Sequence, residues 1–72
     1  MLLRGAGRYA EAAEQVEVLA ALVPGNPAVR VDLVASLRAA GREREAWAAQ
    51  ADAERLFPGD AGVRRMRQLL GG

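Results

Sequence analysis

The chain has 72 residues, of which 51% are hydrophobic, but sixteen are alanine and only three are aromatic. This composition suits one small domain whose helices pack through small side chains. It does not suit a large core that encloses a cavity. The absence of cysteine and histidine excludes disulfides, thiol catalysis and the usual zinc sites, and it removes the commonest general base. Ten arginines against nine acidic residues give a net charge of +1, too balanced for a dedicated nucleic-acid-binding protein.

The N-terminal residues carry no targeting signal that we recognise. A secretory signal needs an apolar stretch of about 7–15 residues, whereas Gly5, Gly7 and Arg8 follow Leu3 almost at once. No run approaches the roughly 20 apolar residues of a membrane span. We therefore expect a cytoplasmic protein without a membrane partner, provided that Met1 is not the edge of a fragment. The use of arginine alone as the basic residue, with abundant alanine, is typical of a GC-rich bacterial genome.

Helical periodicity and end signals predict five helices. The first covers 1–6 and ends at Gly7, because glycine readily adopts the left-handed conformation that terminates helices. The second covers 8–22, where apolar residues recur with helical spacing. This apolar stripe contains Tyr9, Ala12, Ala13, Val16, Leu19, Ala20 and Val23.

Three further helices are expected over 27–40, 43–56 and 60–70. Asn26 is a typical N-cap before a proline at the first helical position, and Asp60 is suited to the same capping role. No segment alternates in the manner of a strand, so we expect an all-α fold with antiparallel neighbours joined by short turns. Ion pairs three residues apart, Arg8 with Glu11 and Arg42 with Glu45, are expected to support two of the helices.

The chain matches itself when it is shifted by 34 residues. Twelve identities occur over the 38 pairs that this offset allows, without a gap. The matched residues include both glycine turns and both prolines in register, which biased composition hardly supplies. The identical pairs include Arg4 with Arg38, Gly7 with Gly41, Ala12 with Ala46, Pro24 with Pro58 and Val29 with Val63.

A 34-residue period of helix, turn and helix resembles the tetratricopeptide repeat. The residues that carry this resemblance are Leu33, Leu37, Gly41, Ala46, Ala53 and Pro58, and before them Gly7, Tyr9, Ala12, Leu19 and Pro24. Three positions depart from the family pattern: Arg30 replaces a large aromatic residue, Glu43 a tyrosine, and Gln50 a large apolar residue. These departures thin the expected core, and Trp47 is placed to fill part of the gap.

The resemblance implies antiparallel helix-turn-helix repeats that form a short right-handed α-solenoid. Residues 1–26 would be a partial repeat, 27–60 a complete repeat and 61–72 a C-terminal capping helix. Repeat arrays usually need three or more units for stability. We therefore expect either the end of a longer array, marginal stability in isolation, or self-association through the N-terminal end.

The sequence offers no convincing catalytic or cofactor site. Glu14 and Glu17 share one helix, but a solvated face is the better interpretation because no apolar pocket surrounds them. Ser36 lacks a nearby base, and we interpret Tyr9 and Trp47 as core residues rather than stacking platforms. The arginines of the last helix fit a solvated cap better than a phosphate-binding patch. These are Arg64, Arg65 and Arg67.

In the family that the chain resembles, the first helix of each pair lines a concave groove for a peptide or partner helix. The groove residues implied for this chain are Arg4, Ala28, Val31, Ala35, Arg38, Ala39 and Arg65. We expect a non-catalytic protein-interaction or scaffold module without metal or cofactor, and an acidic partner is one hypothesis because guanidinium groups suit carboxylates. The alternatives are the C-terminal tail of a larger enzyme and a self-associating structural unit.

Overall fold

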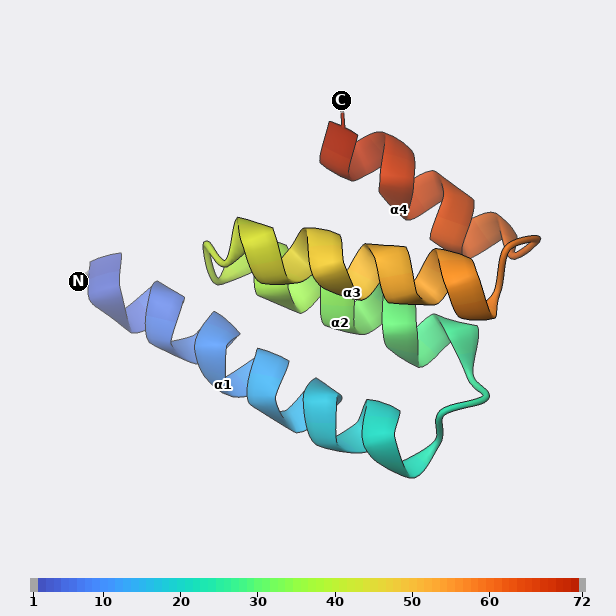
Figure 1. Ribbon diagram of the computed structural model, residues 1–72. Helices are drawn as coiled ribbons and strands as arrows, with labels where there is room; N and C mark the ends of the chain where they lie inside the picture. The colour runs from blue at the N-terminus through green and yellow to red at the C-terminus, as the bar shows by residue number, and fades with distance from the viewer. Residues whose placement is uncertain (1, 72) are drawn as a thin grey trace.

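The computed structural model describes residues 2–71, with side chains from residue 8 onward, and this part of the chain is entirely helical. The helices are α1 (Leu2–Leu22), α2 (Pro27–Ala39), α3 (Glu43–Leu56) and α4 (Ala61–Gly71). Each helix runs antiparallel to the one before it (Figure 1). The predicted all-α class is confirmed. None of these helices is both long enough and apolar enough to cross a membrane.

The starts of α2 and α4 follow the predicted capping residues. The Asn26 side chain accepts a hydrogen bond of 3.0 Å from the backbone N–H of Ala28, and Pro27 occupies the first helical position. Asp60 accepts an equivalent bond of 3.0 Å from the backbone N–H of Val63. Each bond satisfies one of the donors that a helix start leaves without a partner.

Gly41 ends α2 as the sequence predicts. Its φ angle is +80°, the left-handed conformation that glycine adopts at low cost. The Gly41 N–H donates to the Arg38 carbonyl at 3.0 Å, and the Arg42 N–H donates to the Leu37 carbonyl at 2.9 Å. These two bonds form a Schellman motif, which reverses the chain so that α3 packs against α2.

The predicted break at Gly7 is wrong, because α1 is continuous from Leu2 to Leu22. A reversal at Gly7 would need packing between its two arms, and within the described residues α1 contacts no helix other than α2. One glycine inside a helix costs only about 1 kcal/mol relative to alanine. Continuing the helix is therefore the better solution, so Arg4 lies on α1 and not on a separate preceding helix.

The core is centred on α2, which contacts the other three helices. Its members are mostly small, as the alanine-rich composition requires. The buried hydrophobic residues are Ala13, Ala20, Val29, Leu33, Val34, Leu37, Ala46, Ala49, Ala53, Val63 and Met66. The molecule measures 40 × 30 × 16 Å. Its smallest extent is little more than one helix diameter of about 10–12 Å, so side chains on both broad faces reach solvent.

Two predictions about side chains fail at the edges of this core. Tyr9 and Trp47 were expected inside, yet they are 50% and 40% exposed. The Trp47 ring lies beside Gly71 at the end of α4, with solvent on its other side. The Arg42–Glu45 ion pair forms at 3.7 Å, whereas Arg8 and Glu11 make no ion pair within the described part of the chain.

Candidate partner-binding surface

An apolar hollow lies between α2 and α4. It has a volume of about 320 Å³ and opens to solvent. Its lining consists of Ala35, Arg38, Ala39, Met66 and Leu69. We call it the α2–α4 groove. Four of the five side chains are apolar and the fifth is the positively charged Arg38, so the groove offers an exposed hydrophobic surface beside one cation.

Helical spacing explains why α2 contributes these residues. Leu33 and Leu37 face the core, whereas Ala35, Arg38 and Ala39 occupy the open side of the same helix. Two alanines leave the α2 backbone accessible to an incoming chain. The longer Arg38 side chain stands beside them, and it takes part in no ion pair within the described part of the chain.

The opposite wall depends on how α4 is held. Met66 is 7% exposed and belongs to the core, whereas Leu69, one turn further on, is 50% exposed. Gly62 lies next to Val31 of α2 at the start of α4, and a Cβ at this position would be at an ordinary van der Waals distance from that side chain. A Cβ there would lie 3.1 Å from the Asp60 carboxylate and 3.6 Å from Val31.

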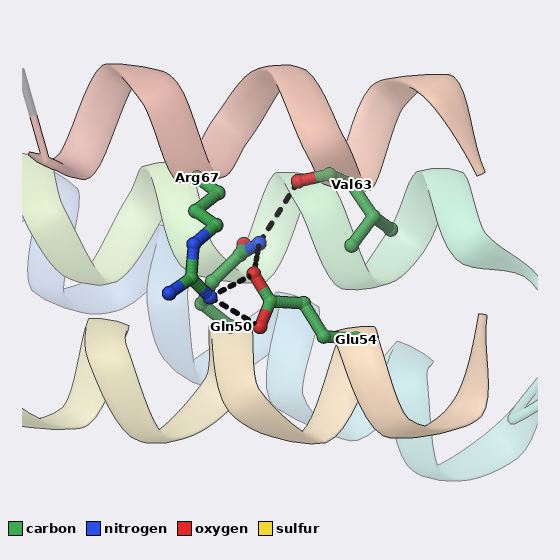
Figure 2. Close-up of polar contacts among 4 residues, drawn as sticks. All are labelled: Gln50, Glu54, Val63 and Arg67. Carbon is green, nitrogen blue, oxygen red and sulfur yellow. Dashed lines mark hydrogen bonds and ion pairs between the residues drawn. The ribbon is translucent and has the colours of Figure 1, made fainter. Parts of the chain in front are cut away.

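A polar cluster fixes α4 against α3 (Figure 2). The Gln50 amide nitrogen donates to the Val63 carbonyl at 2.8 Å and to the Glu54 carboxylate at 3.0 Å. One Arg67 nitrogen donates to both Glu54 oxygens, at 2.6 and 2.8 Å. These bonds join the two helices by directional contacts in addition to their apolar packing.

The same cluster shifts the ionisation of one carboxyl group. Hydrogen bonds from the Arg67 guanidinium and then from the Gln50 amide lower the pKa of Glu54 below its ordinary value of 4.5. Gln50 is only 1% exposed and its carbonyl oxygen has no partner within the described structure. A polar residue at this apolar position therefore does more than thin the core, since its amide bonds the backbone of α4.

The structure brings together three of the seven predicted groove residues: Ala35, Arg38 and Ala39. Val31 is instead half-buried against the core below the start of α4. Ala28 and Arg65 are exposed and do not line the groove. The side chain of Arg4 lies outside the described residues.

Sequence reasoning missed the α4 wall of the groove, formed by Met66 and Leu69. Neither residue was among the groove residues that the sequence predicted. Their spacing of three residues places both on one side of α4. Only the packing of α4 on α2 shows that this side of α4 lines the groove.

No family model, no curated protein and no solved structure matches the chain.

Proposed function

We propose that the protein is a non-catalytic interaction module that binds a partner segment in the α2–α4 groove. The observation that carries this proposal is an open apolar hollow of about 320 Å³ whose lining includes the Arg38 side chain. Exposed apolar surface of this kind, rimmed by polar residues, is typical of sites where proteins bind one another.

The lining of the groove defines the chemistry of the partner. Met66 and Leu69 suit an aliphatic or aromatic side chain inserted between the helices. Arg38 suits a carboxylate next to that anchor, because a guanidinium group forms charge-assisted hydrogen bonds with carboxylates. We therefore propose a peptide or helix with an apolar anchor and an adjacent acidic residue.

We further propose that the helices form a short right-handed solenoid of the tetratricopeptide type. Its support is the 34-residue self-match together with the caps at Asn26 and Asp60, which are themselves 34 residues apart. The antiparallel α2–α3 pair followed by a helix that packs on both is compatible with one repeat and its cap.

Selection from a displayed random-peptide library, with the whole chain as bait, tests the proposed function. We expect the enriched peptides to share a large apolar residue beside Asp or Glu. A charge-assisted contact contributes about 1.5–3 kcal/mol. Arg38→Ala should therefore weaken binding of the enriched peptides by about tenfold or more.

Arg44→Ala is the matched control. Arg44 is exposed on α3 and has no ion-pair partner in the described part of the chain, so its loss should leave peptide binding unchanged. Leu69→Ala should weaken binding by removing the apolar wall. Peptides without an acidic residue, or equal losses from the two arginine variants, would contradict the proposal.

A further inference from the structure

The exposed face of α1 has a counterpart that is buried elsewhere in the same chain. At the 34-residue offset, Ala12, Val16 and Leu19 of α1 correspond to Ala46, Gln50 and Ala53 of α3. The α3 residues are at most 1% exposed, because α3 packs against both α2 and α4. On α1, Ala12 and Val16 are only half-buried and Leu19 is 46% exposed.

Five residues form a continuous apolar stripe on this face, and we call it the α1 stripe. It consists of Tyr9, Ala12, Val16, Leu19 and Val23. The spacing alternates between three and four residues, which is the pattern of a helix-pairing seam. The helical turn extends to the last member, because the Val23 N–H donates to the Leu19 carbonyl at 2.9 Å. Within the described residues, α1 contacts α2 alone. Val16 packs in part against the core on that side, and no helix of the described part of the chain covers the other side of the stripe.

The other end of the molecule does not offer a complementary surface. If α4 of one copy covered α1 of the next, the chain would extend head to tail. The α4 residues at the offset from Arg30 and Val34 of α2 are Arg64 and Gln68, which are exposed and polar. Placing them against an apolar stripe would remove their hydration without supplying partners.

The α1 stripe is instead complementary to itself. In an antiparallel pair centred on Val16, Tyr9 lies opposite the partner's Val23, and Ala12 lies nearest the partner's Leu19. The small Ala12 then packs beside the larger side chain of the partner's Leu19. A parallel pair would place Ala12 against Ala12 and leave a gap.

Charge at the edge of the stripe also favours the antiparallel arrangement. Arg8 and Gln15 each precede a stripe residue and lie along its open edge. Antiparallel pairing places Arg8 beside the partner's Leu22 and Gln15 beside the partner's Gln15, so no like charges meet. Parallel pairing would place the two Arg8 side chains against each other.

We propose that the α1 stripe is a two-fold self-association surface, in which α1 pairs antiparallel with α1 of a second copy about Val16. This surface lies on a different helix from the α2–α4 groove and does not depend on it. The stripe spans about 21 Å, from 1.5 Å of rise per residue. So short a seam belongs to the small, weak class of interfaces, so the dimer should dissociate on dilution.

Sedimentation equilibrium across a concentration series tests the pairing. The average mass should rise with concentration from 7.6 kDa towards twice that value. Leu19→Glu should abolish the rise, because it places a charge in the seam of both copies. Val18→Glu is the matched control, since Val18 is 61% exposed and adjacent in sequence but points away from the stripe. Unchanged circular dichroism would show that both variants are folded.

Cross-linking tests the register, and the absence of native cysteine makes it specific. Under mild oxidation, Val16→Cys should form a covalent dimer, because the two copies of this position meet on the two-fold axis. Glu14→Cys, on the opposite side of α1, should form far less. A monomer at every concentration, equal effects of the two glutamate variants, or equal cross-linking of the two cysteine variants would overturn the proposal.

Discussion

Residues 9–22 of α1 correspond to residues 43–56 of α3 when the chain is shifted by 34 residues. The environments of the two helices nevertheless differ. Helix α3 contacts both α2 and α4, whereas within the described residues α1 contacts α2 alone. The equivalent positions 12 and 46 are both alanine, but Ala46 is fully buried and Ala12 is half-buried. Sequence similarity within a repeat therefore does not decide burial, because burial depends on the neighbouring helix as well as on the residue.

The largest expected difference between the two helices comes from placing a charge at this matched pair. Ala46→Asp would bury a carboxylate without a partner, which costs several kcal/mol, comparable to the stability of a small domain. We expect the variant to lose its helical circular dichroism at 25 °C. Ala12→Asp, measured in dilute solution, should remain folded because its side chain reaches solvent. Similar melting temperatures for the two variants would contradict the assigned environments.

The matched glycines Gly7 and Gly41 sharpen the comparison because their substitutions should act with opposite signs. Gly41→Ala forces alanine into the left-handed conformation and should lower the free energy of unfolding by about 1–2 kcal/mol. Gly7→Ala replaces a glycine inside a continuous helix and should raise the free energy of unfolding by about 0.5–1 kcal/mol. Urea titration measures both changes. Destabilisation by Gly7→Ala would instead indicate that the helix breaks at Gly7, as the sequence predicted.

The smallest expected effect concerns the polar cluster, which α3 has and α1 lacks. The folded pKa of Glu54 lies below its ordinary value of 4.5, so the ionised carboxylate favours the folded state. This contribution is fully present above pH 4.5 and is lost as the pH falls through the lowered folded value. Glu54→Gln should therefore show a weaker loss of stability on acidification than the natural chain. Thermal unfolding at a series of acidic pH values measures this difference. An identical loss of stability in the variant and the natural chain would show that the ionised Glu54 does not stabilise the folded state.

Much of the fold was predictable because its signals are local. The caps at Asn26 and Asp60 and the left-handed turn at Gly41 depend on residues close together in sequence. Gly7 carries the same local signal as Gly41, yet α1 continues through it and contacts no helix other than α2 within the described residues. The outcome at Gly7 was therefore decided by tertiary packing, which the residue pattern does not contain.

The candidate site was predictable only on the α2 side. Ala35, Arg38 and Ala39 lie on one face of a single helix, and helical spacing is enough to group them. Met66 and Leu69 join them only because α4 packs on α2, and Gln50 bonds a carbonyl of the following helix. Contacts between helices depend on crossing geometry, so the α4 wall and the polar cluster required the structure.

Amide hydrogen exchange along the whole chain, followed in dilute and in concentrated solution, tests the contrast between α1 and α3 most directly. In dilute solution we expect amides of 46–53 to exchange more slowly than amides of 12–19, because α3 is covered on two sides. In concentrated solution the protection of 12–19 should rise, while that of 46–53 should change much less. Equal protection of the two segments in dilute solution would contradict the assigned environments, and protection of 12–19 that is independent of concentration would contradict pairing through α1.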